Sequence, residues 1–253
     1  MIHEFIISFT VTGGLPSLDG FGGPRLGPRG FMFVSDSNIR AWLRRYWEML
    51  ELPLMRSWRD IEDLSVRKTS DKRLGNTVMR YTGNNLDSGF RFVDSLLGFP
   101  FKDKRYKDTS WVFGPLQISF AVSEKPVDVS HVKVTSAFAD EGASQRRFGL
   151  RYAVWDIKFV AYATFTPEVW SNDIWKKFFD GTGKILVERG LMRSLNEDSV
   201  SEFIRESLQG SLSTRFSGVV KVFSPKVEER EHYMGPVEMW EILMGGVESG
   251  KDN

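Results

Sequence analysis

The sequence contains no cysteine, which excludes disulfide bonds, metal sites built on thiolates and a cysteine nucleophile. It has only three histidines, His3, His131 and His232, and none has a potential ligand at a metal-binding spacing. No apolar run approaches the ~20 residues needed to cross a bilayer, and the N-terminus reads as a strand rather than as a signal peptide. These absences predict an intracellular, cytoplasmic protein with no membrane partner, no bound metal and no cofactor.

A large excess of one charge is also missing. The chain carries 34 lysines and arginines against 33 acidic residues, a formal net charge of +1. Any site for an anion must therefore come from local clustering rather than from a basic field over the whole molecule. Its 253 residues, of which 41% are hydrophobic, suffice for one large domain or two small ones.

The N-terminal segment combines a strand with a long glycine-rich loop. Residues 4–11 alternate as a strand does, with one face formed by Phe5, Ile7, Phe9 and Val11. The loop that follows, TGGLPSLDGFGGPRLGPRG, lacks the glycine spacing of a Walker or dinucleotide motif. The glycines Gly13 and Gly14 allow close approach of backbone to a ligand, and Arg25 and Arg29 add positive charge. The loop predicts either an anion-binding segment or a surface loop without a ligand.

This loop is expected to run directly into the clearest helix of the chain, residues 35–50. Ser35 or Ser37 can cap its N-terminus. Its apolar stripe recurs at helical spacing, at Ile39, Trp42, Leu43, Tyr46, Trp47 and Leu50. Arg40 and Arg44 lie one turn apart beside that stripe, and Arg40 has no acidic residue four positions later. The pair suits phosphate binding, and a solvated helix face is the alternative.

Residues 66–108 are rich in basic and aromatic side chains, and no regular element is predicted there. Ten basic residues stand against five acidic ones in this segment. Tyrosines and phenylalanines are interleaved with them, from Tyr81 to Tyr106. Cations mixed with aromatic rings suit single-stranded nucleic acid, whose phosphates attract charge and whose bases stack. For most of the aromatic residues, a small satellite core is the interpretation we favour.

From Gly114 onward the pattern predicts paired strands, then helices, then a last strand. HVKVTSAF and LRYAVW alternate and are joined by a glycine-containing tip, which predicts a hairpin over residues 131–155. DIKFVAYATF is a further strand, and SNDIWKKFFDGTGKILVERG is a capped helix that is interrupted or ends near Gly181 to Gly183. EDSVSEFIRESLQG predicts another helix, and TRFSGVVKVFSP predicts a turn and a strand. The fold class is therefore α+β, compatible with an elaborated ferredoxin-like or RRM-like core.

Several of these motifs together resemble a known family. FVSDSNIRAWLRRYW is similar to the first-helix motif of the RAMP-superfamily backbone subunit of type I CRISPR surveillance complexes (Cascade). The family's aspartate-x-arginine stretch and its glycine-proline turn before a strand are matched by Asp103, Arg105, Gly114, Pro115 and Gln117. A basic tip follows at Arg146, Arg147 and Phe148, and Thr214, Arg215 and Gly218 precede the last strand as they do in the family.

The resemblance implies one RRM-like domain over residues 1–253. Its palm would comprise residues 1–50 and 110–253, with a finger insertion at about 51–109 and a β-hairpin thumb at about 131–155. It also implies a non-catalytic role: the subunit would polymerise along guide RNA (crRNA) and hold its backbone, so that exposed bases pair with target DNA. The expected partners are crRNA, target DNA, further copies of the chain, and the small, large and guide-handle-capping Cascade subunits.

The expected RNA-binding residues are Gly13, Gly14, Arg25, Arg29, Arg40, Arg44, Arg105, Gln117, Arg146, Arg147, Phe148 and Arg215. Two alternatives stay open. One is a metal-dependent target-RNA endonuclease, as in type III complexes, with Asp19 or Asp36 as the candidate metal-binding aspartate. Asp36 also suits the start of a helix, where a carboxylate is favoured. The other is a generic RRM-like RNA-binding protein, against which the absence of the usual aromatic strand signature counts.

Overall fold

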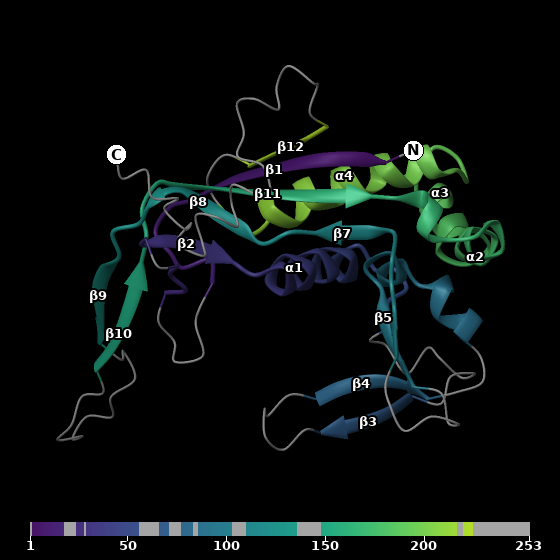
Figure 1. The fold of residues 1–253 in the computed structure, drawn as a ribbon, viewed down its shortest axis with the longest axis horizontal. Coiled ribbons are helices and arrows are strands. Elements are labelled where there is room, and N and C mark those ends of the chain that lie inside the picture. Colours follow the sequence, from purple (N-terminus) through teal and green to yellow (C-terminus); the bar gives the residue numbers. More distant parts are fainter. Residues whose placement is uncertain are drawn as a thin grey trace, which may run out of the picture. The chain divides into compact units, whose positions relative to one another are not determined.

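The structure is a computed structural model that describes residues 2–17, 24–27, 29–55, 66–70, 77–82, 86–102, 110–135, 148–216 and 220–224. Within these residues, the chain has the predicted α+β class (Figure 1). It divides into two compact units. Unit 1 comprises Met1–Phe5, Arg40–Ile118 and Ala163–Ser211, and unit 2 comprises Ile6–Ile39, Ser119–Tyr162 and Leu212–Asn253. The expected single RRM-like domain and its internal boundaries stay a prediction.

The largest sheet has the strand order β12-β1-β11-β8-β2. Its strands are β1 (His3–Val11), β2 (Phe31–Val34), β8 (Ala121–Pro126), β11 (Ile157–Phe165) and β12 (Val220–Phe223). The pairs β1–β12, β8–β11 and β2–β8 are antiparallel. A short strand, β7 (Leu116–Ile118), pairs with the end of β11 inside unit 1. The predicted strands over residues 4–11 and 156–165 are thus confirmed.

Strand β1 is buried on both of its faces rather than on one. Ile6 and Ser8 are buried along with Phe5, Ile7 and Phe9, although simple alternation predicts an exposed second face. Strands β12 and β11 pair with the two edges of β1, so the burial of alternate residues of both sets shows that both of its faces are covered as well. Within unit 2, the ring of Phe9 stacks on Phe159 and on Phe216, with centroid distances of 5.4 and 4.9 Å.

Contrary to expectation, the glycine-rich loop does not run directly into the helix, because the short strand β2 lies between them. Residues Met32 and Val34 of this strand are fully buried, and Phe33 pairs with Val122 of β8. The backbone amide of Met32 donates a hydrogen bond to Ser123 Oγ at 3.0 Å. Four residues flanked by glycine give no periodic signal, so only the pairing with a distant strand reveals this element.

Helix α1 spans Asp36–Met49 and confirms the predicted helix. Ser35 caps it, since the amide of Asn38 donates to Ser35 Oγ at 3.3 Å. Within unit 1, Trp47 stacks on Phe203 of α4 (Glu197–Ser213) with a centroid distance of 6.2 Å. The indole N–H of Trp47 donates to Ser207 Oγ at 3.0 Å. The predicted apolar stripe therefore packs α1 against α4.

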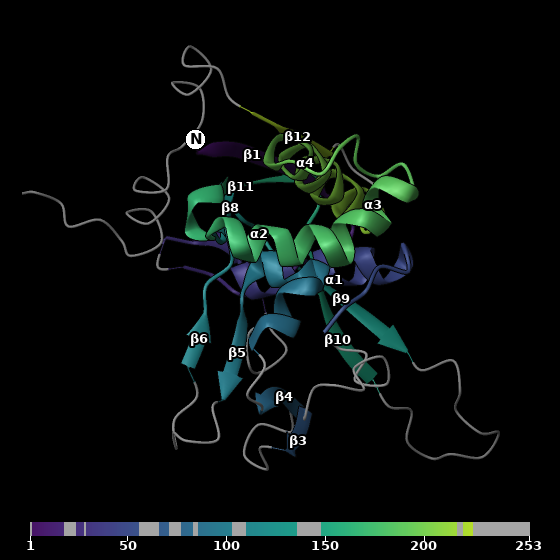
Figure 2. The same cartoon turned by 90° about the vertical axis from the view of Figure 1, so that its right-hand side faces the viewer.

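The segment expected to be irregular contains a second sheet in unit 1, with the order β3-β4-β5-β6. Its strands are β3 (Val66–Ser70), β4 (Thr77–Thr82), β5 (Phe99–Lys102) and β6 (Ser110–Val112). Figure 2 shows β5 and β6 side by side, in antiparallel register. The 3-10 helices η1 (Leu86–Arg91) and η2 (Val93–Leu97) precede them. Strands this short and rich in charge do not alternate, so their pairing was not predictable.

The favoured satellite core is confirmed for Phe90 and Phe99. Both rings are buried, and they meet edge to face at a centroid distance of 5.5 Å. Phe90 also packs edge to face on Trp170, at 5.5 Å, just after the 3-10 turn η3 (Pro167–Val169). These aromatic rings therefore contribute to packing inside unit 1.

The predicted interruption of the helix after residue 171 is confirmed at Gly181. Helix α2 (Asn172–Phe178) passes through a π-helical turn, η4 (Phe179–Gly183), into α3 (Lys184–Glu188). Gly181 has non-helical angles, φ −95° and ψ −108°. A Cβ atom at Gly181 would lie 2.8 Å from both the Cβ and the carbonyl oxygen of Arg91, so this contact requires glycine.

The predicted hairpin is present as two antiparallel strands of unit 2, β9 (Ser130–Thr135) and β10 (Phe148–Ala153), labelled in Figure 1. Phe148 lies opposite Thr135, and Ala153 lies opposite Ser130. The tip between the strands lies outside the described residues. No helix in the described part of the chain is long and apolar enough to cross a membrane.

Candidate nucleic-acid interface

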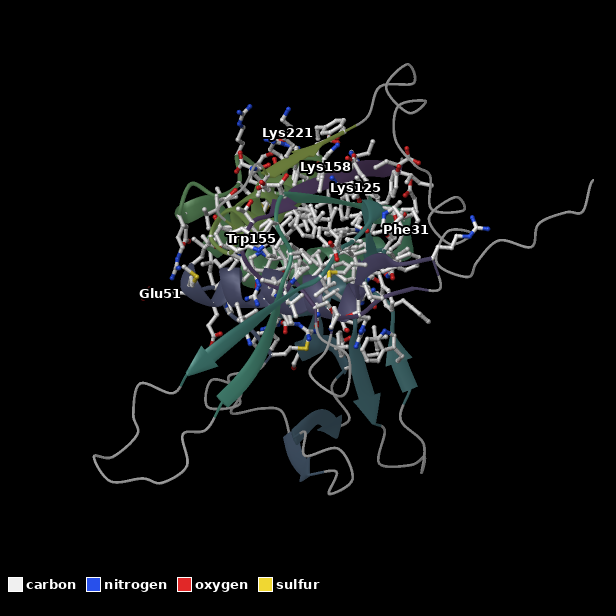
Figure 3. All side chains as sticks on the ribbon, turned by 90° about the vertical axis from the view of Figure 1, so that its left-hand side faces the viewer. Phe31, Glu51, Lys125, Trp155, Lys158 and Lys221 are labelled. Atoms are coloured by element: carbon white, nitrogen blue, oxygen red, sulfur yellow. The ribbon has the colours of Figure 1, made fainter. Side chains whose placement is uncertain are left out.

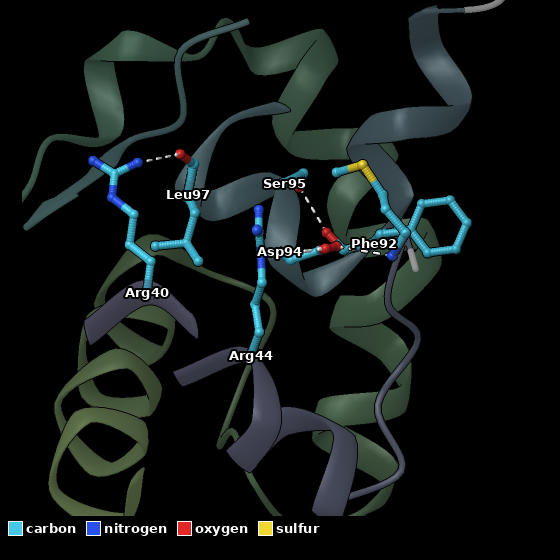
Figure 4. A network of polar contacts seen from close by, with 7 residues as sticks. Arg40, Arg44, Phe92, Asp94, Ser95 and Leu97 are labelled. Carbon is cyan, nitrogen blue, oxygen red and sulfur yellow. Dashed lines mark hydrogen bonds and ion pairs between the residues drawn. The ribbon is translucent and has the colours of Figure 1, made fainter. Parts of the chain in front are cut away.

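Arg40 is held by two polar contacts inside unit 1. Its guanidinium donates to the carbonyl oxygen of Leu97 at 3.1 Å and to Gln117 Oε1 at 3.3 Å (Figure 4 shows the first). Gln117 is itself fixed, because its amide group donates to the carbonyl oxygen of Gly114 at 2.9 Å. The structure thus brings together two of the predicted RNA-binding residues, Arg40 and Gln117. Arg40 is half-buried, and its guanidinium has a defined direction set by Leu97 and Gln117.

Arg44 has a buried acidic partner that the sequence did not reveal. Its Nε lies 3.7 Å from a carboxylate oxygen of Asp94, which is only 2% exposed (Figure 4). Asp94 also accepts a hydrogen bond from the amide of Met55 at 3.0 Å. Asp94 belongs to η2 and reaches Arg44 from another element. Because a buried carboxylate needs a nearby cation, Arg44 has a structural function in unit 1.

The amides of Gly13 and Gly14 are directed into the protein. Both donate to the carbonyl oxygen of Val154, at 2.9 and 3.4 Å, and the amide of Val154 donates back to the Gly14 carbonyl at 2.9 Å. This geometry corrects the expectation that the two amides are available to a phosphate. Contact of either glycine with RNA through other atoms stays a prediction.

Trp155 lies beside these glycines in unit 2, and the sequence patterns did not single it out. Gly13 has φ +77°, and a Cβ atom there would lie 3.0 Å from the indole ring of Trp155. The ring therefore packs directly on the backbone at Gly13, and the side chain is 57% exposed. A tryptophan directly after a strand, followed by an aspartate, was the available signal, but it is a weak one without the structure.

Arg25 and Arg29 occupy the second half of the glycine-rich loop, also in unit 2. The guanidinium carbon of Arg25 lies 5.5 Å from the ring centre of Phe33, a cation–π contact. The carbonyl of Arg25 accepts a hydrogen bond from the amide of Phe33 at 3.0 Å, so this part of the loop follows β2. Arg29 is exposed in the turn that Gly27 and Gly30 close, with an amide-to-carbonyl distance of 3.0 Å.

The remaining predicted residues are distributed as follows. Phe148 is the first residue of β10, at the end of the hairpin strands next to the tip. Arg215 is exposed at the C-terminal end of α4, where its amide donates to the carbonyl of Leu212 at 3.0 Å. Arg105, Arg146 and Arg147 lie outside the described residues. RNA contact by all of these side chains stays a prediction.

The alternative of a metal-dependent nuclease concerns two aspartates. Asp36 lies in the first turn of α1, as the helix-start interpretation predicts. Asp19 lies outside the described residues. Among the residues that the structure describes, no group of three or more histidine or acidic side chains is arranged to hold a metal ion.

Comparisons with known proteins give a structural match only. No protein-family model matches the sequence, and no curated protein matches it either. A chain of a solved structure described as a CRISPR RNA-guided surveillance complex, pre-nicking, is similar to this protein with a TM-score of 0.52 and 11% sequence identity. The match covers 100% of this chain and 84% of that chain.

Two further solved structures match more weakly. A CRISPR RNA-guided surveillance complex gives a TM-score of 0.42 at 13% identity, covering 99% of this chain and 78% of that one. A Type III-B Cmr-beta complex bound to cognate target RNA gives 0.33 at 14% identity, covering 88% and 61%. Neither carries an argument at these scores. At the level of the fold, the first match confirms the resemblance noted in the sequence: the chain has the fold of a subunit of a CRISPR surveillance complex.

Proposed function

We propose that this protein is a guide-RNA-binding backbone subunit of a CRISPR interference complex. Several copies assemble along one crRNA and hold its phosphate backbone, so that the exposed bases pair with target DNA. The observation that carries the proposal is the whole-length agreement in fold with a chain of an RNA-guided surveillance complex. The crRNA, target DNA, further copies of the chain and the other Cascade subunits are the partners of this function.

The strand order supports an RRM-like palm. Read along the chain, β1, β8, β11 and β12 are the four main strands, with α1 after the first and α4 before the last. Their order in the sheet is fourth, first, third and second. This is the arrangement of a ferredoxin-like βαββαβ fold, to which β2 adds an outer strand beside β8. The second sheet of unit 1 corresponds to the finger insertion, and β9 with β10 corresponds to the thumb.

The chemistry of the candidate residues supports backbone binding without catalysis. Arg40 and Gln117 present donors held in place by Leu97 and Gly114. Arg25 lies on the ring of Phe33. Guanidinium and amide groups donate hydrogen bonds to phosphate oxygens, and such contacts position a nucleic acid without reading its sequence, which fits a protein that leaves sequence recognition to base pairing. The nuclease and the generic RNA-binding protein are the two competing functions.

The test is purification of the full chain from cells that express a CRISPR array. We expect a protected RNA of uniform, processed length to copurify and to carry the spacer sequence. A non-CRISPR RNA-binding protein would instead retain RNA of mixed length and origin, which would contradict the proposal. Incubation of the purified complex with target RNA and magnesium addresses the nuclease alternative, since cleavage lost on substitution of Asp19 or Asp36 would support that function.

A further inference from the structure

Trp155 combines high exposure with a rigid support. It is 57% exposed, although a tryptophan gains considerable free energy from burial. It follows β10 and precedes β11, at the root of the β9–β10 hairpin. Figure 3 labels its side chain on the face where both hairpin strands leave the body of the molecule. An exposed aromatic residue alone is ordinary, so the inference depends on what holds it.

The backbone on both sides of Trp155 is fixed. Before it, Val154 forms an isolated antiparallel bridge with Gly14 through two hydrogen bonds of 2.9 and 3.4 Å. After it, Asp156 adopts a left-handed conformation, φ +53°, and its carboxylate accepts a hydrogen bond from Thr12 Oγ1 at 2.9 Å. A non-glycine residue with positive φ is uncommon and persists only where its surroundings hold it.

One side of the indole ring is seated on Gly13. A Cβ atom at this position would lie 3.0 Å from Cζ3 and 3.2 Å from Cη2 of Trp155. The φ of Gly13, +77°, is one that other residues rarely adopt. Two independent features therefore require glycine at position 13: the positive φ of its backbone, and the Trp155 ring, which occupies the space that a side chain would need. The first glycine pair of the loop thus serves to position a tryptophan.

We propose that Trp155 is a stacking surface for an unpaired base of single-stranded RNA. This inference rests on the proposed function and adds to it a residue that binds a base rather than the phosphate backbone. A ring supported from one side by backbone is held in position before the ligand arrives. Base stacking on such a ring is tolerant of sequence, because every base has a π-face.

The surroundings of Trp155 favour a nucleobase over a protein partner. The exposed residues next to the ring, Thr12, Gly13 and Asp156, form no apolar patch, and the apolar side chain of Val154 is buried. A stable protein–protein interface needs about 800 Å² on each partner with an apolar centre. A single aromatic ring among polar residues is large enough for one base to stack on it, but it is too small to form the centre of a protein–protein interface.

The experiment measures binding of the purified full chain to a mixed-sequence RNA oligomer of about 8 nucleotides, a length typical of one single-strand site. We expect Trp155→Ala to weaken binding about 5- to 150-fold, as alanine substitution at base-stacking residues does. The salt dependence of binding should not change, because no phosphate contact is removed. Trp155→Phe should recover part of the affinity, and RNA should quench tryptophan fluorescence less in this variant than in the wild type.

Two controls separate stacking from general damage. Trp111→Ala removes another exposed tryptophan, 50% exposed in unit 1, and should bind RNA as the wild type does. An oligomer whose bases are replaced by abasic sites should bind the wild type and Trp155→Ala equally, because only the bases stack.

The variant Gly13→Ala tests the packing of the Trp155 ring on Gly13. It should displace the ring and weaken RNA binding. Gly190→Ala is the matched control, because Gly190 also has a positive φ, +70°, but nothing lies within 4 Å of an added Cβ. It should change stability without changing RNA affinity. The losses from Gly13→Ala and Trp155→Ala should not add in the double variant, since both act through one ring.

The outcomes distinguish this inference from the proposed function. If the wild type binds the oligomer and Trp155→Ala binds it equally well, the inference is wrong and the proposed function stands. If Trp155→Ala binds the short oligomer normally but adds fewer copies to a longer RNA, Trp155 contacts a neighbouring copy, which also overturns the inference. If the wild type binds neither the oligomer nor crRNA, the proposed function itself fails.

Discussion

At the residue scale, the two arginines of α1 differ in their surroundings although they lie one helical turn apart. Arg44 is 28% exposed and faces the carboxylate of Asp94, which is almost fully buried. Arg40 contacts a carbonyl and a side-chain amide, both uncharged. Removal of Arg44 therefore leaves the buried carboxylate of Asp94 with less compensation in a site of low polarity.

We predict that Arg44→Ala lowers the free energy of unfolding by about 1–3 kcal/mol, the cost of leaving a buried polar group poorly compensated. Urea denaturation measures the loss. Adding Asp94→Asn should recover part of it, because asparagine still accepts the Met55 amide without carrying a charge. No recovery in the double variant would contradict the pairing.

Arg40→Ala is the matched comparison. Loss of its two hydrogen bonds, to Leu97 and Gln117, should cost about 1 kcal/mol each. Its distinguishing effect should appear in RNA binding, where each lost phosphate contact flattens the log–log salt dependence by about 0.7 for a single strand. An affinity and a salt dependence equal to those of the wild type would show that Arg40 serves only unit 1.

At the scale of elements, the β9–β10 hairpin is the part whose function depends most on assembly. Its two strands pair over six residues each, and within the residues that the structure describes no third strand joins their sheet. An isolated two-stranded hairpin is only marginally stable in water. Added contacts with RNA and a neighbouring copy would therefore stabilise it, as the proposed function requires of a thumb.

We predict that replacing residues 136–147 by a short glycine-containing turn leaves the fold of the free subunit unchanged. The register from Thr135 opposite Phe148 can be kept by a tight turn, because the strands are antiparallel. The same variant should lose the periodic protection of guide or target nucleotides in a footprinting experiment on the assembled complex. Periodic protection at the wild-type spacing would show that the hairpin is not the thumb.

At the scale of the whole molecule, a net charge of +1 gives little general attraction to nucleic acid. Under the proposed function, copies are therefore added to RNA by local contacts and by contact with the previous copy. Head-to-tail contacts are heterologous and do not close on themselves, so the RNA sets the length of the assembly.

We predict that the number of copies bound increases stepwise with the length of the guide RNA. Native mass measurement on complexes assembled with guides of increasing length checks this. A ring or a dimer with fixed stoichiometry would keep the same mass for every guide. That result would contradict the assembly of copies as a filament along the RNA. Without RNA, we expect the isolated subunit to be polydisperse.

The sequence by itself determined the class of the fold and most of its helices and long strands. Residues 4–11, 36–49 and 157–165 carry periodicities long enough to be read locally, and Ser35 and Gly181 mark a helix start and an interruption by their own chemistry. The resemblance to a surveillance-complex subunit also depended on local motifs, and the fold agrees with that of the matched chain at 11% sequence identity.

Only the tertiary structure decided which partners these residues have. Strands β3 to β6 pair with segments near in the chain, but they are too short to show a clear alternation. The short strand β2 has no local signal, because it pairs with β8, a segment far away in the sequence. The same reason applies to the candidate site. Asp94 reaches Arg44 from fifty residues away, and Gly13 seats Trp155 across more than half of the chain. Spacing along a helix or strand predicts only which residues are neighbours within that element. The ion pair of Arg44 and the packing of the Trp155 ring depend on contacts with other elements.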